Sequence, residues 1–273
     1  MTTTHFLDIP GGRLHYQVRG TGPLLLLLGA PMSAAHFVPL ADALAGDHTV
    51  VTHDPRGIAG STLDDPEQDS TPDLRADDVA ALLDALGAES ADVFGSSGGA
   101  VTGLALVSRH PQRVRTLIAH EPPLLELLPD AAEQRAGVDD LLVTLEQEGL
   151  GAAMQKFMVN AGFASGGDGP SEAAPTPPPG APSAQDLADG IRFLKHEIRG
   201  TTRYQPDLGA LTAAEARIVV GLGADSGALV THRTTTALAT LLDLQPVEFP
   251  GDHGGFLAGP EVFADTVRKV LAG

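Results

Sequence analysis

Short, continuous apolar runs separated by stretches of helical periodicity constrain the fold of this chain more than any other feature. The first run, Leu24–Leu28, lies between Pro23 and Gly29, and its apolarity is continuous rather than alternating. Such a run is typical of a strand buried on both faces, as in a parallel sheet covered by helices. Residues 34–45 then show helical spacing, and 48–54 form the next predicted strand.

The alternation continues over roughly a hundred residues. The segment 73–86 carries its apolar residues on one stripe and stops at Gly87, a common helix terminator. We expect strands over 90–95 and 114–120, with a helix over 100–109 between them. This order predicts an α/β fold with a mostly parallel, doubly wound sheet.

The strand pattern lapses over residues 122–207 and returns over 216–249. The lapse contains helical patterns and no convincing strand, and it includes the Gly/Pro-rich stretch 162–183, whose composition is typical of a flexible connection. We therefore expect one α/β core made of 1–121 and 208–273, with a helical cap inserted at 122–207.

Composition narrows the class of protein. The 273 residues suit one large domain with an insertion, and 42% hydrophobic residues supply a sizeable core. Lys and Arg total 17 against 35 Asp and Glu, and the net charge of −18 repels phosphate backbones and anionic lipid. We expect neither nucleic acid nor a membrane as a partner. The absence of cysteine excludes disulfides and a thiol nucleophile, and the lack of a signal-peptide pattern favours a cytoplasmic location.

The stretch V-F-G-S-S-G-G (93–99) contains a candidate nucleophile. In G-x-S-x-G the serine occupies a sharp turn from strand to helix, and small residues two positions away on either side let the backbones pass closely. Centring this frame on Ser97 places Gly95 and Gly99 at those positions, whereas centring it on Ser96 places Phe94 there. Ser97 is therefore the candidate; an ordinary loop or an anion-binding helix start is the alternative.

A serine hydroxyl needs a base to take its proton. Of ten histidines, His253 follows the last predicted strand in P-G-D-H-G-G-F, where glycines on either side free the ring to face inward. The alternative is a histidine on a surface loop. No G-x-G-x-x-G follows the first buried strand, no G-x-x-x-x-G-K-[ST] occurs, and H-x-x-x-H spacing is absent, so nucleotide and zinc sites are not indicated.

These motifs together resemble the α/β-hydrolases with a cap domain, and the likeness covers essentially the whole chain. It rests on L-L-L-G-A-P (26–31), H-D-P-R-G-I-A-G-S (53–61), V-F-G-S-S-G-G (93–99) and P-G-D-H-G-G-F (250–256). The resemblance implies that nucleophile, acid and histidine follow one another in that order along the chain, and that no cofactor or metal is required.

The resemblance also implies an oxyanion hole formed by the backbone N–H groups of Ala30 and Gly98, although most relatives have His-Gly where this chain has Gly29-Ala30. It further implies a structural role for Asp54 and Arg56, in a segment braced by an ion pair.

Two carboxylates compete for the role of the acid. One family placement is a G-x-x-D turn after the strand near 218–222; this chain reads G-A-D-S there, so Asp225 comes one residue early and could instead cap a helix. The other placement is the end of the strand after the nucleophile helix, where Glu121 stands in H-E-P-P. That fragment resembles the H-E-x-P of the capped zearalenone lactonases. We favour Glu121, for which a solvated loop carboxylate is the alternative.

The resemblance implies a serine hydrolase that cleaves a carboxylic ester or lactone through Ser97, His253 and Glu121. A lactonase for an apolar lactone such as zearalenone is the narrower prediction. Carbon–carbon bond hydrolases share the triad, and a non-catalytic ligand-binding protein on this fold remains a separate alternative. Epoxide hydrolases and haloalkane dehalogenases need an aspartate where this chain has Ser97, so these two classes of enzyme are excluded. The substrate and the oligomeric state stay open.

Overall fold

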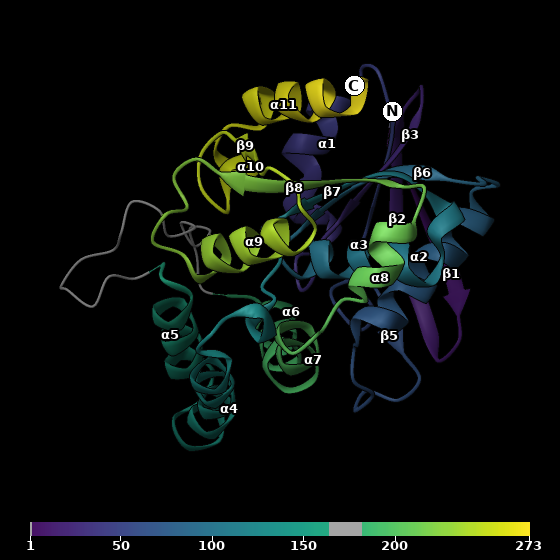
Figure 1. The fold of residues 1–273 in the computed structure, drawn as a ribbon. Helices are drawn as coiled ribbons and strands as arrows, with labels where there is room; N and C mark the ends of the chain where they lie inside the picture. Colours follow the sequence, from purple (N-terminus) through teal and green to yellow (C-terminus); the bar gives the residue numbers. More distant parts are fainter. Residues whose placement is uncertain (1, 164–181) are drawn as a thin grey trace.

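A mixed sheet forms the centre of the computed structural model, which describes residues 2–163 and 182–273 (Figure 1). Most of the predicted connection at 162–183 lies outside the described residues. The strands are β1 (Thr3–Ile9), β2 (Gly12–Gly20), β3 (Leu24–Leu28), β4 (Thr49–His53), β5 (Thr62–Leu63), β6 (Ala91–Ser96), β7 (Val114–His120), β8 (Arg217–Gly223) and β9 (Val247–Phe249).

The strand order is β1-β2-β4-β3-β6-β7-β8-β9, with the short β5 paired to β2. The pairs that involve β1, β2 or β5 are antiparallel, and all pairs from β4 through β9 are parallel. The N-terminal hairpin therefore extends an otherwise parallel sheet, and the predicted mostly parallel architecture is confirmed.

Helices cover both faces of this sheet (Figure 1). They are α1 (Val38–Leu44), α2 (Pro72–Ala85), α3 (Gly98–Arg109), α8 (Leu208–Ala213), α9 (Val230–Leu241), α10 (Gly255–Ala258) and α11 (Pro260–Ala272). One apolar cluster gathers residues of α1, α10 and α11, and another gathers residues of α2, α3, α8 and α9. The sheet thus lies between two helical layers.

Strand β3 shows why its sequence is continuously apolar. Leu26 and Leu28 pack in the cluster with α2 and α3, whereas Leu25 and Leu27 pack in the cluster with α1 and α11. All four side chains are fully buried. Because successive side chains of a strand point to opposite faces, a strand between two helical layers has no position for a polar residue.

The described part of the segment 122–207 is mostly helical. It contains the helices α4 (Ala131–Glu148), α5 (Leu150–Ala161), α6 (Ala184–Arg192) and α7 (Ile198–Thr202), and the short turns η3 (Leu125–Leu127) and η4 (Phe193–Glu197). Helices α4 to α7 lie together at the bottom of Figure 1. An apolar cluster that includes Leu141, Ala153, Phe193 and Ile198 joins α4, α5, η4 and α7.

The helical sequence pattern over 184–199 is interrupted in the structure. Between α6 and α7 the chain widens into the π-helical turn η4, which ends at the buried Glu197. Such a turn holds one more residue than an α-helical turn and changes which side chains face inward. The elements β5, α8 and α10 were not predicted, because they are too short to show a hydrophobic period.

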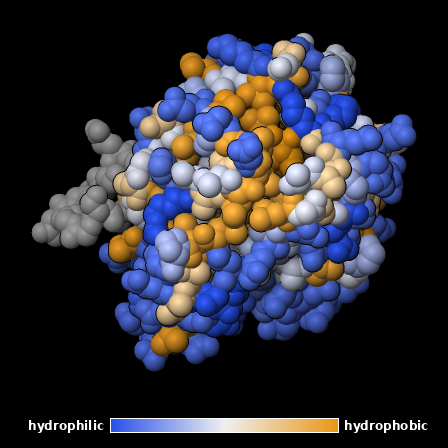
Figure 2. Space-filling view, viewed as in Figure 1, coloured by the Kyte–Doolittle hydropathy of each residue, from blue (hydrophilic) through white to orange (hydrophobic). Residues whose placement is uncertain are grey.

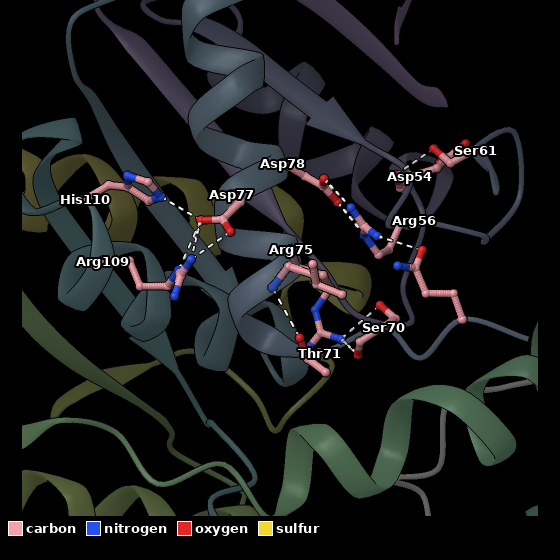
Figure 3. A network of polar contacts seen from close by, with 12 residues as sticks. Asp54, Arg56, Ser61, Ser70, Thr71, Arg75, Asp77, Asp78, Arg109 and His110 are labelled. Atoms are coloured by element: carbon pink, nitrogen blue, oxygen red, sulfur yellow. Dashed lines mark hydrogen bonds and ion pairs between the residues drawn. The ribbon is translucent and has the colours of Figure 1, made fainter. Parts of the chain in front are cut away.

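The segment H-D-P-R-G contributes to structure through two separate contacts. Arg56 makes a bidentate pair with Asp78 of α2, at 2.8 and 2.6 Å (Figure 3). Asp54 instead contacts Nδ1 of His15 at 2.7 Å and accepts the N–H of Ala34 at 2.8 Å. The ion pair that braces this loop therefore joins Arg56 to α2, and Asp54 holds the loop after β3.

Polar side chains cover most of the face shown in Figure 2, and an apolar band crosses its middle. The polar cover agrees with the net charge of −18. Within residues 2–163 and 182–273, no helix combines the length and the apolarity needed to cross a membrane.

The aromatic cluster on the α11 side gives a test of the core. Phe94 is fully buried, and its ring lies 5.5 Å from that of Phe263 and 6.2 Å from that of Phe256. We expect Phe94→Ala to lower the free energy of unfolding by about 3–5 kcal/mol, because it leaves a cavity. Phe6→Ala, at a side chain that is 51% exposed, should cost about 1 kcal/mol or less. Urea unfolding measures both; equal losses would contradict this assignment of the core.

Candidate active site

Ser97 lies at a sharp turn between β6 and α3. Its φ of 56° and ψ of −125° fall in a region that residues with a side chain rarely adopt. Its N–H donates to the carbonyl of His120 at 3.0 Å, which fixes the turn against β7. A Cβ added to Gly99 would overlap the carbonyl oxygen of Leu28, so only glycine fits two residues after the serine. The strand–turn–helix context that G-x-S-x-G requires is therefore present.

Glu121 follows β7 and also has a positive φ, of 50°. Its side chain is fully buried, and each carboxylate oxygen has a donor. Oε1 accepts the N–H of Gly223 at 2.8 Å. Oε2 accepts the hydroxyl of Thr231 at 2.9 Å and lies 2.6 Å from Nδ1 of His253. The carboxylate thus joins β8, α9 and the loop after β9.

The charge of Glu121 is stabilised by these partners. Burial by itself would raise its pKa, but the hydrogen bond and the charge of His253 outweigh burial and lower the pKa to about 2. The carboxylate is therefore ionised at neutral pH. Because an ionised carboxylate only accepts hydrogen bonds, Nδ1 of His253 carries a proton, and in the neutral ring Nε2 is left as the acceptor.

Asp225, the competing acid, lies elsewhere. Its side chain is exposed, and its backbone N–H donates to the carbonyl of Gly251 at 2.9 Å. Across the described residues, no hydrogen bond links the Asp225 carboxylate to His253. It does not cap the next helix either, since the N-cap of α9 is Leu229. Of the two carboxylates, the structure brings Glu121 to the histidine.

A cavity of about 810 Å³ lies over this edge of the sheet. Ser97 and His253 both line it, together with side chains of the helices α4 to α7. In the described part of the chain, no hydrogen bond joins Ser97 to His253; such contacts often tighten only when substrate is bound. The lining is predominantly apolar and includes Leu125, Leu141, Met154, Met158, Phe157, Phe163 and Phe193.

The two predicted oxyanion donors also lie at this cavity. Gly98 is the first residue of α3, where an N–H has no partner within the helix. Ala30 follows β3 and lies against Gly98, since a Cβ added to Gly98 would come within 3.0 Å of the Ala30 side chain. The N–H of Gly98 and the positive end of the α3 dipole therefore lie beside Ser97, and Ala30 packs against them.

Two residues near the histidine did not emerge from sequence reasoning as site residues. His120 is buried directly behind the site, with its ring centroid 6.2 Å from that of His253, and burial lowers its pKa to about 4. Its place in H-E-P-P is a signal that could have identified it. Thr231, which donates to Glu121, lies 110 residues away in sequence and carries no local signal.

The fold is that of an α/β-hydrolase, with two helical layers around a mostly parallel sheet. The site agrees with this class, because a serine lies on the strand–helix turn and a buried carboxylate contacts a histidine. The chain belongs to this family: a model of the alpha/beta hydrolase fold matches residues 22–144, and a relative named as a hydrolase is 35% identical over 97% of this chain. The predicted fold class and the family resemblance are thereby confirmed.

Particular relatives span nearly the whole chain. The sequence is 35% identical to an uncharacterized hydrolase, YraK, of Bacillus subtilis, over 97% of this chain and 94% of the relative. It is 28% identical to a zearalenone hydrolase of Bionectria ochroleuca, over 99% of this chain and all of the relative. The structure is similar to a thermophilic esterase from Thermogutta terrifontis, with a TM-score of 0.72, 20% identity, and coverage of 100% and 98% of the two chains.

The lowered pKa of Glu121 predicts how stability depends on pH. A carboxyl whose pKa falls from 4.5 to about 2 on folding stabilises the native state above pH 4.5, and this contribution is lost as pH falls towards 2. We expect the free energy of unfolding, measured with urea, to drop by about 2 kcal/mol more for wild type than for Glu121→Gln between pH 6 and pH 3. Parallel pH profiles of the two proteins would contradict the strong native-state interaction of this carboxylate.

Proposed function

We propose that this α/β-hydrolase cleaves a carboxylic ester or lactone with Ser97 as nucleophile, His253 as base and Glu121 as acid. One observation carries the proposal: the 2.6 Å contact between Nδ1 of His253 and the fully buried Glu121 carboxylate. This contact fixes the tautomer that leaves Nε2 for the cavity that Ser97 also lines.

The proposed reaction proceeds in two halves. Nε2 of His253 takes the Ser97 proton as Oγ attacks the acyl carbon, and the N–H groups of Ala30 and Gly98 stabilise the oxyanion. The imidazolium, stabilised by Glu121, then protonates the leaving alkoxide, which stays tethered when the substrate is a lactone. In the second half His253 deprotonates a water, the water attacks the acyl-enzyme, and Ser97 is regenerated as the carboxylic acid leaves.

A lactonase for an apolar lactone such as zearalenone is the narrower form of the proposal. It is supported by the H-E-P-P sequence at Glu121 and by the similarity to a protein named zearalenone hydrolase. The cavity volume of about 810 Å³ and its predominantly apolar lining suit a bulky, uncharged ligand.

Three alanine variants test the assignment of roles. We expect Ser97→Ala to abolish turnover of chromogenic short-chain esters and of a panel of lactones. Glu121→Ala should lower kcat by about 10³–10⁴-fold, because the histidine loses its orienting partner. Asp225→Ala should stay near wild type, since its carboxylate is exposed.

The opposite pattern, with Asp225→Ala crippled and Glu121→Ala active, would overturn the choice of acid. Wild type and Ser97→Ala that are equally inactive on the whole panel, yet still bind apolar ligands, would favour the ligand-binding alternative.

The charges around the cavity predict a preference for uncharged substrates. No Lys or Arg is among the described residues that line it, whereas Glu133, Asp186 and Asp189 are. Residues 164–181 contain no Lys or Arg in their sequence. We expect kcat/KM for p-nitrophenyl butyrate to exceed that for p-nitrophenyl hemisuccinate, whose acyl chain has the same length, by tenfold or more, about 1.4 kcal/mol. Added salt should narrow the gap; equal values would contradict the prediction.

A further inference from the structure

Arg75 of α2 is a buried cation that the proposed reaction does not use. Its side chain is only 1% exposed, and a buried guanidinium is costly unless its donors are satisfied. One donor nitrogen contacts the carbonyl and hydroxyl of Ser70, at 2.6 and 3.2 Å (Figure 3). The remaining contacts go to two other parts of the molecule, the nucleophile helix and the inserted segment.

We call these two sets of contacts the first and second arm of Arg75. The first arm consists of hydrogen bonds to α3, the helix that follows Ser97. Nε of Arg75 donates to Oγ1 of Thr102 at 2.9 Å, and that hydroxyl donates to the carbonyl of Gly98 at 3.1 Å. A hydroxyl has one proton, so the two hydrogen bonds run in one direction, from the cation to the first turn of α3. Gly98 is the residue whose N–H we assign to the oxyanion hole.

The second arm reaches the wall of the cavity. Another guanidinium nitrogen donates to Oγ1 of Thr201 at 2.9 Å, and Thr201, on α7, lines the cavity. The guanidinium nitrogen that contacts Ser70, Nη1, also lies 3.4 Å from Oε1 of the buried Glu197. Glu197 ends the π-helical turn η4, a local feature that is frequent at functional sites. The Glu197 carboxylate forms an ion pair with the Arg75 guanidinium.

We propose that Arg75 is a positioning residue that holds the first turn of α3 and the α7 wall of the cavity in a fixed relation. The inference rests on the proposed function, because it acts through the oxyanion donor Gly98. The two arms should affect different kinetic constants. A donor that matters only in the transition state changes kcat, whereas a wall that contacts substrate throughout changes KM.

Thr102 tests the first arm. Thr102→Val removes the hydroxyl with little change of shape, and Thr102→Ser keeps it. We expect Thr102→Val to lower kcat, and the rate at which a fluorophosphonate labels Ser97 by displacement of fluoride, about tenfold, with KM within about twofold. Thr102→Ser should restore both to within about twofold of wild type. Thr201→Val, on the second arm, should raise KM about fivefold and leave kcat within about twofold.

Arg56 provides the matched control. It is as buried as Arg75, at 2% exposure, and it pairs with Asp78 on the same helix. Its side-chain hydrogen bonds go to Asp78 and Gln68 rather than to α3 or α7. Arg56→Lys should therefore lower the melting temperature without slowing the labelling of Ser97. Arg75→Lys should lower the melting temperature and also slow the labelling.

The outcomes separate the two hypotheses. A wild-type protein whose Ser97 is not labelled, and which hydrolyses no ester or lactone, would overturn the proposed function and this inference with it. An active, labelled wild type overturns the positioning role alone if Thr102→Val and Thr102→Ser label equally fast. The same holds if Arg56→Lys slows labelling as much as Arg75→Lys does.

Discussion

The buried carboxylate of Glu121 is the interaction on which the arrangement of the site depends. A charge removed from water must find its hydrogen bonds within the protein, and here the donors come from three segments: the end of β8, the first turn of α9 and the loop after β9. Satisfying one carboxylate therefore fixes three elements against the end of β7. Burial alone would raise the pKa of Glu121, and the hydrogen bond and charge of His253 lower it to about 2.

The parallel sheet explains why these residues can meet. Ala30, Ser97 and Glu121 each follow the carboxyl end of a strand, β3, β6 and β7, and these three strands are successive neighbours in the sheet. His253 follows β9 and reaches back to Glu121 across the end of β8. The carboxyl edge of a parallel sheet gathers such residues regardless of their distance in sequence. Ser97 and Glu121 both adopt positive φ, so backbone strain is concentrated at this edge, as it often is at functional sites.

Polar contacts from α6 and α7 attach the segment 122–207 to the core. Asp189 accepts the N–H of Ala59 at 3.1 Å, Arg192 donates to the carbonyls of Pro66 and Gln68 at 2.7 Å, and Arg75 reaches Thr201. These contacts bring the cavity wall to the loops after β4 and β5. Helix packing closes the cavity with apolar side chains, while the polar contacts determine where that wall lies.

The sequence by itself determined the features that depend on neighbours along the chain. The apolar run of β3 predicted a strand between two helical layers, the glycine frame separated Ser97 from Ser96, and the glycines around His253 marked an inward-facing turn. Each is a local pattern with a local physical cause. The short elements β5, α8 and α10 had no such pattern, and the π-helical turn before α7 breaks a helix whose sequence reads as continuous.

Only the tertiary structure decided which groups contact each other. Glu121 and Asp225 both lie near strand ends, and the sequence could not tell which carboxylate faces His253, because that depends on the register of β7 against β8. Arg75 lies one turn before Val79 on the buried face of α2, and only the packing of α2 against α3 and α7 supplies the groups that satisfy its charge. Such contacts join residues 27 to 132 positions apart, and their energies arise only when the chain has folded.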